Sequence, residues 1–139
     1  MNEAVKVDIA ELAEAELEKS YEVMRELRTH LTREAYLERL REMSSYGYRL
    51  LAPQAGVAFD LNLYWGRHLF VYDLITAEVH RSRGYGQRLL NYIHELAEEE
   101  NCERDALSSG FAREGAHRFY EREGYEHTGY IFVKRLANV

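Results

Sequence analysis

The clearest alternation of apolar and polar positions in the chain lies between residues 85 and 100. Apolar side chains recur there at Leu89, Leu90, Ile93, Leu96 and Ala97. This spacing is close to the roughly 3.6-residue period of an α-helix, and it gathers these side chains on one face. The acidic run at residues 98–100 is typical of a solvated surface. The segment is therefore predicted to be an amphipathic helix that covers a core.

The other hydrophobic patterns predict shorter elements, separated by turn residues. Helices are predicted at residues 10–28, 33–44 and 113–123, and strands at residues 5–9, 48–52, 56–65, 67–76, 104–109 and 130–136. Thr32 precedes the second helix as a candidate N-cap, and Gly124 follows the helix at 113–123 as a candidate C-terminal cap. The order βααβββαβαβ predicts an α/β protein.

Length and composition describe one soluble domain. A chain of 139 residues is long enough for a substantial core but too short for two, so residues 1–139 are expected to form a single domain. No apolar run approaches the roughly 20 residues of a membrane span, and the first residues lack the features of a signal peptide. The single cysteine, Cys102, excludes an internal disulfide and fits a reducing compartment. A cytoplasmic protein without a membrane partner is expected.

Between the strand at 67–76 and the amphipathic helix lies the motif Arg81-x-x-Gly84-x-Gly86. Two glycines at a strand-to-helix turn let the backbone approach a ligand closely and direct N–H groups at it. The helix N-terminus adds a partial positive charge, so the turn is suited to a pyrophosphate. Arg83 and Arg88 add positive charge here, although the whole chain has a formal net charge of −6. This favours a local anionic ligand and argues against nucleic-acid binding.

Other phosphate-binding motifs fit this turn less well. A P-loop requires Lys followed by Ser or Thr after its glycines, and a dinucleotide-binding fingerprint requires a third glycine where this chain has Leu89. The remaining alternative is an ordinary glycine-containing turn.

A second block, Ala116-His-Arg-Phe119-Tyr120-Glu-Arg-Glu-Gly124-Tyr125, follows at a separation that accommodates one helix, one strand and the start of another helix. Together the two blocks resemble the motifs of the GNAT-type N-acetyltransferase superfamily, with Tyr125 where relatives have Phe. The resemblance implies a mixed, mostly antiparallel sheet of six to seven strands with helices on both faces. In that fold the fourth and fifth strands, here residues 67–76 and 104–109, splay apart.

The resemblance also implies acetyl-CoA as co-substrate. The backbone of Ile75 and Thr76 would contact the pantetheine arm. The pyrophosphate would be held by the run from Arg81 to Arg88, which comprises Arg81, Ser82, Arg83, Gly84, Tyr85, Gly86, Gln87 and Arg88. One position departs from the family pattern: Arg113 stands where many relatives have an Asn that contacts the cofactor. Its guanidinium could bind a phosphate or face water.

Acetyl transfer from a thioester to an amine requires an amine without its proton and a stabilised leaving thiolate. A phenol can donate a proton to a thiolate, and the resemblance implies a position near the sulfur for Tyr120; packing in the core is the alternative. Asp73 lies in an apolar strand, where burial would raise its basicity, so it is a candidate base; a structural hydrogen bond is the alternative. Glu78, His68 and His80 are treated as solvated surface residues. A base that acts through water, or none, is left open.

The acceptor is expected to be a primary amine of a small molecule or a protein. No nucleophile is evident, so direct transfer in a ternary complex is predicted, without a metal. In this fold the acceptor side is built from the first two helices, the loop between them and the last strands. The residues in such places are Arg28, His30, Tyr36, Tyr46, Tyr64 and Trp65, most of which are expected to be core or surface residues. The alternative function is a catalytically inactive CoA-binding sensor or regulatory module. A homodimer is considered possible.

Overall fold

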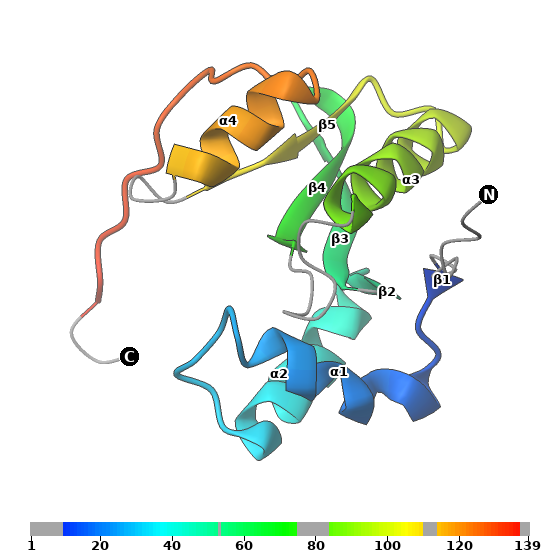
Figure 1. Ribbon diagram of the computed structural model, residues 1–139, viewed down its shortest axis with the longest axis vertical. Coiled ribbons are helices and arrows are strands. Elements are labelled where there is room, and N and C mark those ends of the chain that lie inside the picture. Colours follow the sequence, from blue (N-terminus) through cyan, green and yellow to red (C-terminus); the bar gives the residue numbers. More distant parts are fainter. Residues whose placement is uncertain (1–9, 53, 75–83, 110–113, 137–139) are drawn as a thin grey trace. The chain divides into compact units, whose positions relative to one another are not determined.

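The computed structural model describes residues 10–52, 54–74, 84–109 and 114–136 (Figure 1). These residues belong to two compact units, Met1–Leu107 and Ser108–Val139. The first unit contains β1 (Ala10–Glu11), a 3₁₀ turn (Glu14–Glu16), α1 (Leu17–Met24), α2 (Arg33–Ser45), β2 (Arg49–Ala52), β3 (Ala55–Asn62), β4 (Gly66–Leu74), α3 (Tyr85–Glu99) and β5 (Arg104–Leu107). The second contains α4 (Glu114–Arg122). The expectation of a single domain stays a prediction.

The first unit is built on a five-stranded sheet in the order β1-β2-β3-β4-β5. The neighbours from β1 to β4 are antiparallel, whereas β4 and β5 are parallel. The mixed, mostly antiparallel α/β arrangement confirms the predicted fold class, with fewer strands than the expected six to seven. Pairing between β4 and β5 runs from His68↔Arg104 to Val71↔Leu107, and β4 continues beyond it to Leu74.

The missing strands have different explanations. The strand expected at residues 5–9 lies outside the described residues. The prediction of a strand at residues 130–136 is wrong, because this segment has no strand structure. Its alternating apolar side chains suit a sheet, but Phe132 and Val133 are 93% and 87% exposed. A strand requires a hydrogen-bonded neighbour, and hydrophobic alternation in a sequence cannot supply one.

The helix predicted at residues 10–28 begins late, at Leu17. Ala10 and Glu11 instead pair with Ala52 and Leu51 as the edge strand β1. The carboxylate of Glu11 accepts hydrogen bonds of 2.9 and 3.0 Å from Arg49 on β2. Tertiary pairing thus overrides the helix propensity of this alanine-rich and glutamate-rich segment. The second helix begins as predicted, with the Ala35 N–H donating to Thr32 Oγ1 at 3.1 Å.

The amphipathic helix α3 packs against one face of the sheet. Its residues Leu89, Leu90 and Ile93 are fully buried, as the periodicity predicts. His94 on the same helix lies 2.5 Å from the Asp105 carboxylate of β5. Asp105 pairs with Leu69 of β4, so this face of the sheet also carries the fully buried Leu69 side chain. None of the helices in the described ranges is long and apolar enough to cross a membrane.

A second cluster of buried side chains joins α1 and α2 to the start of β2, comprising Met24, Tyr36, Leu40, Tyr48 and Leu50. In Figure 1, α1 and α2 lie together at one end of the strands, away from α3. The sheet of the first unit therefore carries helices on two sides.

A β-bulge interrupts the regular alternation near the end of β4. Gly56 of β3 pairs with Asp73, but the next residue, Val57, pairs with Val71. One residue on β3 thus corresponds to two on β4, and Tyr72 is the extra residue. A bulge of this kind re-aims the side chains next to it. Asp73 accordingly contacts residues of the α1 and α2 side and does not follow Leu69 and Val71 beneath α3.

Candidate active site

The turn before α3 is described from Gly84 onward, and Gly84 occupies the N-cap position of this helix. Its φ of 78° lies in the left-handed region, which glycine adopts without the steric cost that a side chain would add. The predicted ligand contacts of Ile75, Thr76, Arg81, Ser82 and Arg83 lie outside the described residues, as do Glu78, His80 and Arg113.

The first turn of α3 has features that fit an anionic ligand. The backbone N–H groups of Tyr85 and Gly86 lie at the start of the helix, where N–H groups generally lack an acceptor within the helix. The Arg88 N–H donates to the Gly84 carbonyl at 3.1 Å, one turn earlier. Gly84 provides no side-chain cap, and the first turn contains no acidic residue. A pyrophosphate could therefore accept hydrogen bonds from N–H groups at this end of the helix, and the helix dipole would stabilise its negative charge.

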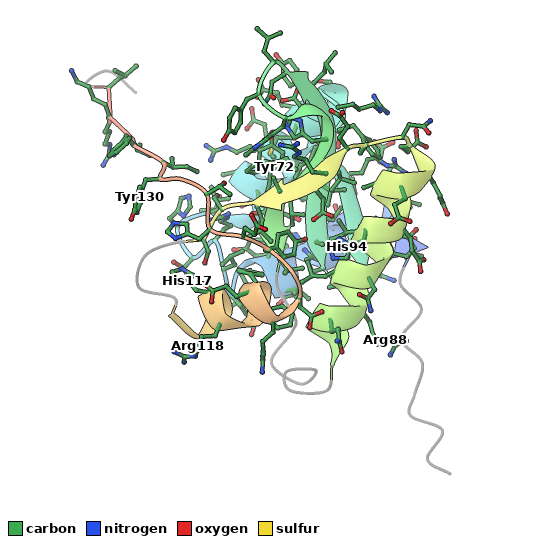
Figure 2. The ribbon with its side chains drawn as sticks, turned by 90° about the horizontal axis from the view of Figure 1, so that it is seen from above. Tyr72, Arg88, His94, His117, Arg118 and Tyr130 are labelled. Carbon is green, nitrogen blue, oxygen red and sulfur yellow. The ribbon has the colours of Figure 1, made fainter. Side chains whose placement is uncertain are left out.

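Arg88 adds a positive charge to the same helix. Figure 2 shows Arg88 and His94 on α3, with Arg88 nearer the beginning of the helix. The guanidinium is therefore suited to support an anion bound at that end.

Tyr120 lies on α4 in the second unit and is 8% exposed. Its ring packs against Phe119, with centroids 5.6 Å apart, and against Tyr125, at 6.0 Å. The helix ends as predicted at Gly124, whose φ is 97°. The Tyr125 N–H donates to the Tyr120 carbonyl at 3.0 Å and the Gly124 N–H to the Glu121 carbonyl, which is a Schellman cap. The cap fixes the backbone of the motif that contains Tyr120.

Asp73 is buried at the end of β4, and both of its carboxylate oxygens are engaged. Arg28 donates from Nε to Oδ1 at 2.9 Å, and its Nη2 lies 2.8 Å from the same oxygen. Tyr48 donates from its hydroxyl to Oδ2 at 2.6 Å. Arg28 Nη2 also donates to the Tyr72 carbonyl at 3.2 Å, at the bulge. These bonds tie the end of β4 to the residues that follow α1 and precede β2.

Further buried polar groups lie near Asp73 and Tyr48. Tyr36 and Ser20 share a hydrogen bond of 2.6 Å, and Gln54 donates to the Ser20 carbonyl at 3.0 Å. Burial is the main cause that raises the pKa of the Tyr36 phenol above its ordinary value. The Tyr48 hydroxyl fills the space that a Cβ at position 56 would need, so glycine is required beside it.

The role of Tyr48 has a consequence for stability. Tyr48→Phe is expected to lower the free energy of unfolding by about 1–3 kcal/mol at neutral pH, because one oxygen of buried Asp73 loses its donor. Burial, followed by the nearby Asp73 charge, raises the pKa of Tyr48 well above its usual 10.0. The unfolded chain therefore loses this proton first, so the stabilisation is complete below about pH 10 and declines as the pH rises further.

Denaturant titrations between about pH 7 and pH 11 would test this linkage. The wild-type protein should lose stability more steeply than Tyr48→Phe above about pH 10. Parallel profiles for the two proteins would contradict the proposed linkage.

Three further features of the described residues bear on the chemistry of the site. The interpretation of His68 as a surface residue is wrong, because it is 2% exposed and its Nδ1 lies 2.9 Å from the Gly66 carbonyl. Desolvation raises the pKa of the Cys102 thiol, which disfavours the nucleophilic thiolate. The described residues contain no cluster of His, Cys, Asp and Glu side chains that could hold a metal ion.

The sequence singled out Asp73 and placed Arg28 on the acceptor side, but it did not connect them to each other or to Tyr48. The carboxylate lies 45 residues from Arg28 and 25 from Tyr48 along the chain. A charged residue in an apolar strand was the available signal, since buried carboxylates need partners. The identity of those partners depends on the bulge, which has no clear sequence signal.

Comparison with known proteins agrees with this architecture. The model of the Acetyltransferase (GNAT) family matches residues 16–125. An uncharacterized N-acetyltransferase of Bacillus subtilis, YhdJ, is 36% identical over 126 residues, which cover 84% of this chain and 89% of that protein. The aminoalkylphosphonate N-acetyltransferase of Salmonella typhimurium is 31% identical over 96 residues, which cover 64% of this chain and 62% of that protein.

Among solved structures, the aminoglycoside N-acetyltransferase AAC(6′)-Iy in complex with CoA is similar in fold, with a TM-score of 0.79. The match has 14% sequence identity and covers 93% of each chain. The family match spans both the glycine turn and the Tyr120 block, and the relatives at the level of sequence are N-acetyltransferases. The chain belongs to the GNAT family of acetyltransferases and is an acyltransferase of the N-acetyltransferase type.

Proposed function

We propose that this enzyme transfers an acetyl group from acetyl-CoA directly to a primary amine while both substrates are bound. The observation that carries the proposal is the first turn of α3. This turn follows the Gly84-x-Gly86 motif of a GNAT family member, receives no side-chain cap from Gly84 and contains no acidic residue. Acetyl-CoA supplies the activated acyl group as a thioester.

The residues proposed to hold acetyl-CoA fall into three groups. The backbone of Ile75 and Thr76 would contact the pantetheine arm. The run from Arg81 to Arg88 would bind the pyrophosphate, with backbone N–H groups at Gly84, Tyr85, Gly86 and Gln87 and with the side chains of Arg81, Ser82, Arg83 and Arg88. Arg113 would add a further charged donor. Charge-assisted hydrogen bonds of this type are stronger than neutral ones, which suits a ligand with several anionic oxygens.

Tyr120 is proposed as the group that stabilises and protonates the leaving thiolate. A phenol with an ordinary pKa near 10 can donate to a thiolate whose conjugate acid has a pKa of about 8.5. Its burial on a capped helix supports a fixed hydroxyl position, and a fixed donor avoids reorganisation when charge develops.

Asp73 is the candidate for assisting deprotonation of the amine. Its contacts favour the structural alternative, because both oxygens already accept hydrogen bonds, from Arg28 and Tyr48. Deprotonation through water is consistent with this arrangement. Asp73 would then act by holding Arg28 and the bulge in position.

The proposed acceptor is a small primary amine. The Salmonella typhimurium relative, named for an aminoalkylphosphonate, supports a small amine over a protein acceptor. The enzyme is proposed to work in the cytoplasm, without nucleic-acid or membrane partners; the net charge of −6 and single cysteine support this.

Release of free CoA thiol provides the test of the proposed function. With acetyl-CoA and a panel of small amines and lysine-containing peptides, thiol release is expected to depend on the amine and to saturate with at least one small amine. Binding of acetyl-CoA without amine-dependent thiol release would instead support the alternative, an inactive CoA-binding sensor or regulatory module.

A further inference from the structure

Arg28 is held in a fixed orientation immediately after α1. Its guanidinium uses Nε and Nη2 to contact Asp73 Oδ1, at 2.9 and 2.8 Å, and Nη2 also donates to the Tyr72 carbonyl at 3.2 Å. The Arg28 backbone N–H donates to the Met24 carbonyl at 2.8 Å, which extends the end of α1. Both ends of this long side chain are therefore anchored within the first unit.

The ion pair is asymmetric in its exposure. The Asp73 side chain is 10% exposed, whereas that of Arg28 is 43% exposed. Nη1 of Arg28 has no hydrogen bond to any residue that the structure describes. The pair thus buries its carboxylate and presents to solvent the edge of the guanidinium that carries Nη1.

The location of this exposed edge relates it to the reaction. Arg28 contacts Tyr72 and Asp73 at the bulge, and Leu74 is the last residue of β4. The residues that follow β4 lead to the glycine turn proposed to hold acetyl-CoA. An amine positioned for acetyl transfer at this end of β4 would have the Arg28 guanidinium as a neighbour.

We propose that Arg28 binds an anionic group on the acceptor, so that the substrates are small amines bearing a carboxylate, phosphate or phosphonate. This inference rests on the proposed function and specifies its substrate class. Nη1 of this guanidinium carries two N–H groups that can donate charge-assisted hydrogen bonds to the oxygens of such an anion. Because three contacts already fix the side chain, binding an anion requires little further ordering. Asp73 orients the cation from its buried side.

The test compares matched amines that differ in the anionic group. Initial rates are measured with aminoethylphosphonate against ethanolamine, and with β-alanine against its amide. The wild-type enzyme should prefer the anionic member of at least one pair, and the pair that it prefers distinguishes a phosphonate from a carboxylate. Arg28→Gln should lower kcat/KM for that anionic acceptor roughly 10- to 100-fold, mainly through KM, as expected for a lost charge-assisted hydrogen bond. The value of kcat/KM for the neutral acceptor should fall by a clearly smaller factor, so the ratio between the two acceptors should decrease.

Two further variants separate recognition from folding. Arg25→Gln removes an exposed arginine whose surface partner is Glu22, at 3.4 Å, and should leave the acceptor preference unchanged. Arg28→Lys keeps the positive charge beside Asp73 and should retain part of the preference even if Arg28→Gln is too unstable to assay.

The possible failures are distinguishable. The inference is overturned if the Arg28 variants lose the same factor in kcat/KM for both members of each pair. It is also overturned if the wild-type enzyme does not prefer an anionic acceptor. Either result leaves the acetyltransferase function standing. If the wild-type enzyme acetylates no amine, the proposed function fails and this inference fails with it.

Discussion

Gly86→Val should reduce the affinity for acetyl-CoA by at least about 100-fold while the protein remains folded. Gly86 lies in the first turn of α3, next to the N–H groups proposed to bind the pyrophosphate. A branched side chain there would hold the anion away from these donors. The loss of two charge-assisted hydrogen bonds, each contributing about 1.5–3 kcal/mol, accounts for an effect of this size. Isothermal titration calorimetry with acetyl-CoA measures it directly.

Gly86→Ala is the matched control, because it adds one methyl group at a helical position and should weaken binding less. Gly84 is less suitable for this purpose. Its φ of 78° means that any side chain would strain the backbone, although a Cβ there meets no described atom within 4 Å. A Gly84 variant therefore tests whether the turn needs its backbone conformation, whereas a Gly86 variant tests whether the pyrophosphate needs the room beside the helix start. Unchanged affinity of Gly86→Val for acetyl-CoA would contradict the proposal that the pyrophosphate binds at this turn.

Tyr120→Phe should lower kcat on the order of 100-fold or more and leave KM for acetyl-CoA nearly unchanged. The substitution retains the ring that packs on Phe119 and Tyr125 and removes only the hydroxyl. General acid assistance is typically worth roughly 10²–10⁴ in rate. The contact with sulfur strengthens only as negative charge develops, so its loss affects kcat more than binding. Steady-state rates with a poor amine, for which chemistry limits turnover, provide the measurement.

Tyr125→Phe makes the same chemical change on the neighbouring ring, whose centroid is 6.0 Å away. It should leave kcat within about threefold of wild type, since the proposed role depends on one hydroxyl. If Tyr120→Phe retains full kcat, Tyr120 is a packing residue and the thiolate leaves without its help.

Local features of the fold were predictable from the sequence because they depend on neighbouring residues. The periodicity at Leu89, Leu90 and Ile93 identified the buried face of α3. Thr32 and Gly124 mark helix ends through short-range hydrogen bonds, and both have the predicted roles. The glycine turn and the Tyr120 block are local motifs, so they indicate the family without any tertiary contact.

The features that could not be predicted depend on residues distant in the sequence. Ala10 and Glu11 form a strand because Ala52 and Leu51 are available as partners, which local helix propensity does not reveal. Residues 130–136 have a strand-like sequence but no strand structure. Their local pattern does not supply the neighbouring strand that a sheet requires.

The same limit applies at the candidate site. Asp73 was identified as an unusual carboxylate in an apolar strand. Its ion pair with Arg28 and its bond with Tyr48 follow from the extra residue at Tyr72. A one-residue change in register redirects a side chain, and its sequence signal is weak.

The most direct test of acetyl transfer to an amine follows the acetyl group itself. The enzyme is incubated with a small amine and acetyl-CoA carrying a carbon-13 label in the acetyl group, and products are identified by NMR and mass spectrometry. Direct transfer predicts one labelled amide formed on the amine nitrogen for each thiol released, with no label retained on the protein. A labelled acetyl-protein that passes its acetyl group to the amine would contradict direct transfer, and bound acetyl-CoA that never yields a labelled amide would contradict the proposed enzymatic function.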